Sequence, residues 1–510
     1  MVKTLATRNL LPALFALLVV IAALVAPPRS NLGLIKLTGA LSAVPSVTAV
    51  DPTFGSDAGG ATVIITGSNY FADPGTMVNF GATPASSFTV DSVSQITAVS
   101  PAHVDGTIDV TVTTTFGTSA TSPSDLFTFV AGAPGRFNPM NPTRVLDTRS
   151  GPKLGPGASI DVPFAGISVP GNTTAVVINV TATDTTTDGF FTVYPTAASR
   201  PNASNVNWVA GQTVPNLVMV SLGAGGFVTI YNAKGSANAV VDLEGYYAPP
   251  SGPTAGGFVA LPPSRVADTR QGSGKPYEGL FLGPGMTREI QITGAGGVPG
   301  TGVEAVVVNA TVTNTTAPSF LTAYPTGGSL PNASNLNWVA GKTIANRVVV
   351  SIGTGGMVTF YNRKGTTDLV IDVNGYFTDG TASGAQFVGV TPSRLVDTRN
   401  GTGGSTGRIA IGATHVVDVA GNGGVPAMGS ATPPTAVVLN VTATGPTGAG
   451  YFTVYPGGTP RPTASDLNFL TGQTVPNLVV VQIGFDGTVN VANIGHGATH
   501  LVVDVVGWLG

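Results

Sequence analysis

One block of sequence occurs three times after residue 135, and this repetition constrains the fold more than any other feature. Each copy opens with Pro-x-Arg-x-x-Asp-Thr-Arg, and the three openings begin at Pro142, Pro263 and Pro392. About one hundred residues separate each opening from a closing apolar strand, which is the length of a domain and far more than a solenoid repeat. We therefore expect three tandem domains, each with a core of its own.

The composition predicts strands rather than helices in these domains. Charged residues make up only 9% of the chain, which also contains 69 Gly and 39 Pro, a combination that suits many short strands joined by turns. Each copy contains about eight short apolar runs. Some, such as 436–441, are apolar at nearly every position and predict strands that are covered on both faces. We expect a β-sandwich or jelly-roll-like module, with a closed barrel as the alternative.

Residues 45–131 differ from the repeats and predict a smaller domain. Val63 and Ile65 alternate with polar or smaller residues, as a half-buried strand requires. Further alternation predicts about seven short strands in fewer than ninety residues, which is typical of a small immunoglobulin-like sandwich.

This first domain resembles the IPT/TIG family of immunoglobulin-like domains. The resemblance rests on Gly59-Gly60, on the strand exit Ile65-Thr-Gly-Ser-Asn-Tyr-Phe71, on Val78-Asn-Phe-Gly-Ala82 and on the hairpin between 101 and 112. It implies a spacer or adhesive module of the kind found in bacterial surface proteins. The DNA contacts that some members make are not expected, because the segment lacks a basic surface.

Residues 136–510 look like the Asp-Thr-Arg-type β-repeats of actinobacterial surface proteins. This resemblance implies a surface location and a β fold, but no particular activity. The chain is therefore divided into a signal peptide or anchor with its linker (1–44), an IPT/TIG-like domain (45–131) and β-repeats 1, 2 and 3 (136–250, 256–379 and 385–510).

The N-terminus predicts export. Lys3 and Arg8 precede an apolar run from Leu10 to Ala26, which has the pattern of a signal peptide. Cleavage near 38–40 and retention as a single anchor are both compatible with this run. In either case we expect the rest of the chain outside the cell or on its surface, with membrane contact only through an uncleaved N-terminal segment.

Several function classes are disfavoured by composition. The net charge is −3 with no basic cluster, so no nucleic-acid partner is expected. Cysteine is absent, which removes disulfides, thiolate metal sites and cysteine nucleophiles. No nucleophile elbow, zinc-protease, phosphate-loop or calcium-loop motif is present, so we expect no catalytic residues, no metal and no cofactor.

The best candidate for ligand binding is the block Asn-Ala-Ser-Asn-x-Asn-Trp, whose candidate residues are Asn207, Trp208, Asn337 and Trp338. Aromatic rings can stack on sugar faces, and amides can hydrogen-bond hydroxyl groups. The alternative is that the tryptophans fill core positions and the asparagines form turns. In the third copy the tryptophan is replaced by Phe469.

The repeated charges have two interpretations. They could grip a ligand carboxylate or hydroxyl, but we favour internal ion pairs, because a carboxylate in an apolar strand needs a partner. We expect the last arginine of each opening motif to contact the aspartate of the closing strand. The residues concerned are Asp147, Arg149 and Asp242 in repeat 1, Asp268, Arg270 and Asp372 in repeat 2, and Asp397, Arg399 and Asp504 in repeat 3.

Three functions follow from these patterns. The favoured one is an exported, non-catalytic structural or adhesive protein of the cell surface. The alternative is a multivalent carbohydrate-binding protein with one site per repeat, and a hydrolase of unrecognised type is the least favoured. The expected partners are a cell-wall or extracellular polysaccharide, or other surface proteins.

Overall fold

The computed structural model describes residues 44–510 except 52, 57, 58, 60, 102, 104, 105, 131–133, 250–254 and 431. In this part of the chain the regular structure is β-strand with three single-turn 3₁₀ helices, which confirms the all-β prediction. No helix in it has the length and apolar composition that a membrane crossing requires. The predicted export signal lies outside the described residues.

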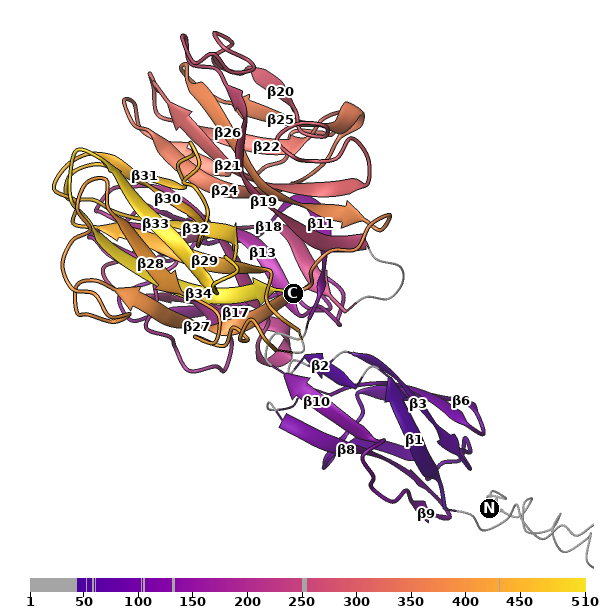
Figure 1. The fold of residues 1–510 in the computed structure, drawn as a ribbon. Coiled ribbons are helices and arrows are strands. Elements are labelled where there is room, and N and C mark those ends of the chain that lie inside the picture. The colour runs from indigo at the N-terminus through magenta and orange to yellow at the C-terminus, as the bar shows by residue number, and fades with distance from the viewer. Residues whose placement is uncertain are drawn as a thin grey trace, which may run out of the picture. The chain divides into compact units, whose positions relative to one another are not determined.

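The first domain is a two-sheet sandwich (Figure 1). One sheet has the order β1-β3-β7-β6, and the other has the order β2-β10-β8-β4-β5 with β9 paired to β8. Phe80, Phe127 and Phe129 pack edge to face between the sheets and fill the core. The strands are β1 (Ser46–Asp51), β2 (Phe54–Ser56), β3 (Thr62–Ser68), β4 (Met77–Phe80), β5 (Thr83–Pro84), β6 (Ser87–Ser92), β7 (Gln95–Val99), β8 (Gly106–Thr114), β9 (Gly117–Thr118) and β10 (Leu126–Val130).

Each repeat is an eight-stranded jelly roll. In repeat 1 an inner sheet has the order β11-β18-β13-β16 and an outer sheet has the order β12-β17-β14-β15, which is the strand order of two interleaved Greek keys. Repeats 2 and 3 have the same order. The two sheets remain separate, so the sandwich prediction is confirmed over the closed barrel.

The strands of repeat 1 are β11 (Arg136–Asp147), β12 (Ser159–Pro163), β13 (Ala175–Thr183), β14 (Gly189–Pro195), β15 (Val206–Trp208), β16 (Val214–Ser221), β17 (Phe227–Asn232) and β18 (Asn238–Ala248). Those of repeat 2 are β19 (Ala255–Asp268), β20 (Thr287–Gln291), β21 (Val303–Thr313), β22 (Ser319–Pro325), β23 (Leu336–Trp338), β24 (Ile344–Ser351), β25 (Met357–Asn362) and β26 (Asp368–Asp379). Those of repeat 3 are β27 (Phe387–Asp397), β28 (Thr414–Asp418), β29 (Ala436–Thr444), β30 (Gly450–Pro456), β31 (Leu467–Phe469), β32 (Thr474–Gln482), β33 (Thr488–Gly495) and β34 (His500–Leu509).

The inner sheet of each repeat is covered on both faces, as the continuous apolar runs predict. In β13, Val176 and Ile178 point into the sandwich core of repeat 1, whereas Ala175 and Val177 belong to a different cluster. Because successive side chains of a strand point to opposite faces, an apolar run of this kind needs two apolar surroundings.

The second cover comes from the other two repeats. Each repeat has its own sandwich core, and a fourth cluster contains inner-sheet residues of all three repeats. In this shared cluster Phe137 of repeat 1 stacks on Phe377 of repeat 2 at 4.3 Å between ring centroids. Tyr247 of repeat 1 lies 4.6 Å from Phe387 of repeat 3, again between ring centroids. The three jelly rolls are thus packed on one another through a common core, in addition to the core that was expected in each repeat.

A ring of asparagines closes this arrangement. Asn179 of repeat 1 donates to the Ser334 carbonyl of repeat 2 (2.6 Å), Asn309 of repeat 2 to Ser465 of repeat 3 (2.6 Å), and Asn440 of repeat 3 to Ser204 of repeat 1 (2.5 Å). A second set of amides, Asn346, Asn477 and Asn216, donates to the side-chain oxygens of Asn179, Asn309 and Asn440. The contacts run from repeat 1 to 2, from 2 to 3 and from 3 back to 1, so the linear chain forms a closed ring of three repeats.

Two of the three contacts between repeats also bury an ionisable pair or group. Between repeats 2 and 3, Arg347 is fully buried and pairs with Asp466 at 2.7 Å. Between repeats 1 and 2, Glu244 accepts a hydrogen bond from Asn335 at 2.7 Å. Asn335 and Asp466 hold the same position in repeats 2 and 3, whereas Arg347 stands where repeat 1 has Leu217.

Candidate ligand-binding cavity

The aspartate of each closing strand lies in a buried, bidentate ion pair. Asp242 is held by Nε and Nη2 of Arg144 at 2.8 and 3.1 Å, and both residues occupy paired positions of β18 and β11. The same geometry joins Arg265 to Asp372 and Arg394 to Asp504. Burial raises the pKa of Asp242, and the contact with Arg144 opposes this rise.

The partner in these pairs differs from the expected one. Arg144 is the first arginine of the opening motif, whereas the last one, Arg149, turns back onto Asp147 at 2.5 Å. Arg270 and Arg399 likewise contact Asp268 and Asp397 at 2.6 Å. The reason is register: Arg144 is directly opposite Asp242 in the ladder, whereas Arg149 lies beyond the strand in the 3₁₀ turn Thr148–Ser150.

The Asp-Thr-Arg motif therefore closes the end of the first strand. The Asp147 carboxylate accepts hydrogen bonds from the backbone and guanidinium of Arg149, which lowers the pKa of Asp147 to about 2. The Thr148 hydroxyl accepts a hydrogen bond from the backbone N–H of Ala239 (2.9 Å), linking the turn to the start of β18. Each part of the motif has a partner inside its own repeat, which leaves none of its charges directed at a common site.

The two candidate tryptophans lie in sandwich cores. Trp208 and Trp338 are only 4% and 5% exposed, and each belongs to the core cluster of its own repeat. Trp208 packs edge to face on Phe191 and donates from Nε1 to the Thr187 carbonyl (3.0 Å). A ring with this burial has no open face, so of the two interpretations the geometry supports the one in which the tryptophans fill core positions.

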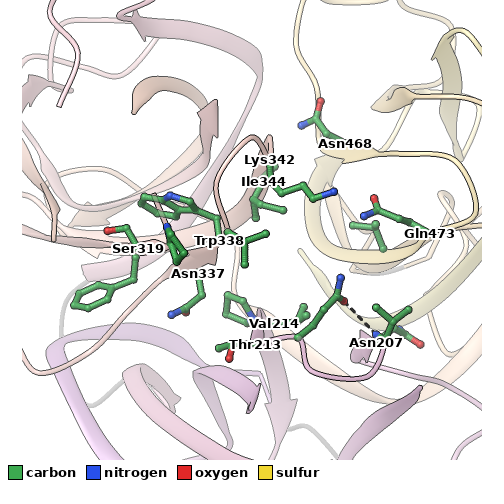
Figure 2. Close-up of a pocket in the computed structure, with 18 of the residues that line it drawn as sticks. Asn207, Thr213, Val214, Ser319, Asn337, Trp338, Lys342, Ile344, Asn468 and Gln473 are labelled. Carbon is green, nitrogen blue, oxygen red and sulfur yellow. Dashed lines mark hydrogen bonds between the residues drawn. The ribbon is translucent and has the colours of Figure 1, made fainter. Parts of the chain in front are cut away.

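The polar residues beside these tryptophans meet at one place. Asn207, Asn337 and Asn468 hold the same position in repeats 1, 2 and 3, and all three line a single cavity of about 480 Å³ (Figure 2). The ring of asparagines brings the three segments together, because the carbonyls of Ser204, Ser334 and Ser465 in the same block are its acceptors. The repeated block thus builds one composite cavity instead of three separate sites.

The lining of this cavity mixes amides and hydroxyls with apolar walls. Gln212, Gln473 and Thr213 add polar groups, while Val214 and Ile344 are among the apolar ones. The volume lies within the roughly 300–1,000 Å³ range of small-molecule sites, which are commonly apolar with a few convergent polar groups. One polar group of the lining, the Asn468 amide nitrogen, has no hydrogen-bond partner within the described structure.

The charged side chains of the cavity come from repeat 2 alone. Lys342, Arg363 and Lys364 are in the lining, and no Asp or Glu is. Figure 2 shows Lys342 extending toward Gln473 of repeat 3. Arg363 also lies over the Phe320 ring, with 5.6 Å between its guanidinium carbon and the ring centroid.

A smaller hollow of about 230 Å³ lies between repeats 1 and 3 and shares Asn207, Val209 and Thr474 with the larger cavity. It contains one acid, Asp188, and one base, Lys234. The Asp188 carboxylate accepts a hydrogen bond from the Ala210 backbone N–H at 3.0 Å. This hollow is therefore balanced in charge, unlike its neighbour.

Sequence reasoning identified the block that lines the cavity but not the convergence of its copies or the cationic residues of repeat 2. Lys342 carries a visible signal, since the other two copies have Gln212 and Gln473 at its position. Arg363 stands where the other copies have Ala233 and Ile494. Convergence itself depends on contacts between repeats, which a comparison of single repeats does not reveal. Within the described residues no group of three or more metal-binding side chains is found.

Comparison with known proteins identifies the first domain. Residues 45–129 match the IPT/TIG domain family, so the immunoglobulin-like prediction for this segment is confirmed. The match covers only this part of the chain, and the Asp-Thr-Arg repeat type stays a prediction. Comparison with curated protein sequences gives no match.

Comparison with solved structures gives matches of low identity and low TM-score. A structure described as the triple jelly roll fold and turret assembly of an archaeal virus has 10% identity, covers 74% of this chain and 90% of its own, and has a TM-score of 0.16. Two proteins named SGBP-B are also among the matches. The one from a xyloglucan utilization locus of Bacteroides uniformis has 11% identity, 66% and 100% coverage and a TM-score of 0.14. The one from Bacteroides ovatus, solved with a mixed-linkage heptasaccharide, has 12% identity, 94% and 96% coverage and a TM-score of 0.14. Scores this low carry no argument about function.

Proposed function

We propose that this protein is a non-catalytic extracellular binding protein in which three jelly rolls act as one body and hold a carbohydrate in their composite cavity. The observation that carries the proposal is the convergence of Asn207, Asn337 and Asn468 on one cavity of about 480 Å³. Amides and hydroxyls between apolar walls suit sugar rings, which combine hydroxyl groups with apolar C–H faces. The IPT/TIG domain at 45–129 would act as a spacer or adhesive module.

A composite cavity changes the expected stoichiometry. Three independent repeats would bind three ligands per chain and gain avidity. A cavity that needs all three repeats binds one. Isothermal titration of the full secreted chain with an oligosaccharide selected on a glycan array should therefore give one site per chain.

The test of the cavity uses a substitution that fills it. Val339 lines the cavity and its side chain is largely exposed, so Val339→Trp should block the cavity without disturbing a core. Leu330→Trp is the matched control, because Leu330 is a similarly exposed aliphatic residue of repeat 2 outside the cavity. We expect at least tenfold weaker binding for Val339→Trp and unchanged binding for Leu330→Trp. Absence of binding to any glycan, or equal binding by the two variants, would contradict the proposal.

A structural or adhesive surface role is the second candidate, and the shared core favours it. A ring joined by a common apolar cluster and by buried amides is well suited to a rigid surface element. An adhesion assay with the Val339→Trp variant distinguishes the two roles. A structural or adhesive protein should still adhere to surfaces when the cavity is filled, whereas a protein that acts through its cavity should not. Extracellular location is part of both proposals, and N-terminal sequencing of the protein from the culture medium would test it.

A further inference from the structure

We infer that the ligand of the composite cavity is an acidic saccharide, one that carries carboxylate, sulfate or phosphate groups. This inference rests on the proposed carbohydrate-binding function and narrows its ligand class. It comes from the charge of the cavity wall that repeat 2 supplies.

The wall of repeat 2 has gained positive charge relative to the other repeats. Lys342 replaces the glutamines of repeats 1 and 3, and Arg363 replaces an alanine and an isoleucine. The acid that repeat 1 has at Asp188 is also absent, since Pro318 stands there in repeat 2 and Ala449 in repeat 3. The result is three cationic side chains in a cavity without a carboxylate, in a chain whose net charge is −3.

These cations form no ion pair within the described structure. Lys342, Arg363 and Lys364 are absent from every ion pair between described residues, in contrast to the arginines of the opening motifs. The glutamine that Lys342 replaces has a structural task in the other repeats. Gln212 and Gln473 accept a hydrogen bond from the backbone N–H three residues earlier, at 3.1 and 2.8 Å. Repeat 2 has given up this turn-closing contact, and it presents an ammonium group to the cavity instead.

Repeat 2 also differs from repeat 1 in a buried donor behind this wall. The Nε1 of Trp338 is buried and has no acceptor in the described structure, whereas that of Trp208 donates to the Thr187 carbonyl. The cause is local: repeat 2 has Ser319 where repeat 1 has Gly189, and a Cβ built on Gly189 would come within 3.0 Å of the Trp208 ring. This donor lies in the sandwich core, so the charge of the cavity wall carries the inference. Three cations without a carboxylate beside them favour an anionic ligand.

The experiment compares oligosaccharides that differ in charge alone. Oligogalacturonate and its methyl ester have the same sugar backbone, and heparin-type oligosaccharides with their desulfated forms make a second pair. We expect the full chain to bind an anionic member at least tenfold more tightly than its neutral counterpart, with affinity falling as salt rises from about 50 to about 500 mM.

The variant test exchanges the cations for residues that other repeats already use at these positions. K342Q with R363A copies repeat 1, so the fold should tolerate both changes. The control is K275Q with R461A, which removes the same charge from exposed positions outside the cavity. Loss of two charge-assisted contacts should weaken anionic binding by roughly ten- to a hundredfold, and the control should leave it unchanged.

The outcomes separate this inference from the function on which it rests. Equal affinity for charged and neutral members, with K342Q/R363A unaffected, overturns the acidic ligand but leaves a carbohydrate cavity. Binding of neither kind of glycan overturns both. Loss of anionic binding in the control as well as in K342Q/R363A shows a general charge effect and overturns the cavity assignment.

Discussion

The contact between repeats 2 and 3 and the contact between repeats 1 and 2 share a backbone and an asparagine ring, but their buried polar groups differ. The first contains a charged pair, Arg347 with Asp466, together with hydrogen bonds from Arg347 to the Leu478 carbonyl and to Asn374. The second contains Glu244, which has one amide partner and a second carboxyl oxygen that is buried without a partner. Burial raises the pKa of Glu244 to about 8, which favours its neutral, protonated form.

The difference shows how three copies of one domain can each select a particular neighbour in the ring. The asparagines and the shared core are the same at every contact and supply the geometry. The positions equivalent to Arg347 are Leu217 and Leu478, and those equivalent to Glu244 are Asn374 and Val506. Because a buried cation is tolerated only opposite its anion, Arg347 and Asp466 make repeat 3 the right neighbour for repeat 2.

The largest effect is expected when the charged contact loses its anion. Asp466→Ala leaves Arg347, which is fully buried, without a counter-charge, and should lower the free energy of unfolding by about 3–5 kcal/mol. Urea unfolding of the full chain, followed by tryptophan fluorescence, measures this. The control is R347L with D466N, which gives this contact the leucine and asparagine of the other two, and it should recover most of the loss. A double variant as unstable as Asp466→Ala would show that the unpaired Arg347 charge is not the cause of the lost stability.

The stability that Glu244 contributes to the contact between repeats 1 and 2 should depend on pH. Glu244 has a pKa of about 8 in the folded chain against a usual value of 4.5, so between these values the folded state binds more protons than the unfolded state. Stability contributed by this residue is therefore complete below pH 4.5 and is lost as pH rises toward 8, by on the order of 2–4 kcal/mol. The measurement is the difference in unfolding free energy between the wild type and Glu244→Gln across this range. A difference that does not change with pH is the contrary result.

An ion pair inside one repeat should matter less than the pair between repeats. Asp372→Ala removes the bidentate partner of Arg265, but Arg265 keeps a contact with Asp268 and remains partly exposed. We expect a loss of about 2–3 kcal/mol, located in repeat 2. Hydrogen exchange of the inner sheet of repeat 2, compared with that of repeat 3, shows whether the lost stability is confined to repeat 2. Unchanged exchange in repeat 2 would show that this pair does not stabilise the fold.

The smallest effect is expected for the exposed end of the opening motif. Arg149 is half exposed, and its removal leaves Asp147 within reach of Arg144 and of water. Arg149→Ala should cost less than about 1 kcal/mol. Thermal unfolding of Arg149→Ala and Asp372→Ala under the same conditions compares the stability that each variant loses. A loss as large as that of Asp372→Ala would contradict the expectation that the buried pair stabilises the repeat more than the exposed one.

The fold inside each repeat could be predicted from sequence because its signals are local. Alternating and continuous apolar runs indicated the strands, and the closing aspartate in an apolar strand indicated a buried pair. The partner of Asp242 could not be predicted from such local signals. Arg144 and Arg149 belong to the same short motif, and only the register of the two strands shows that Arg144 lies opposite Asp242. The ring was missed for a related reason. The run from Ala436 to Val441 required a cover on its second face, but nothing in a single repeat says that the cover is another copy.

Closure also limits how such a gene can change. In an open array each added or deleted copy alters only the ends, so unequal recombination readily changes copy number. In this ring Asn440 of the last copy donates to Ser204 of the first, and every copy covers an apolar sheet face of its neighbours. A chain with two copies would leave that face in water, and a fourth copy would have no gap to enter. The number three is thus fixed by packing, and selection should remove length variants of this region.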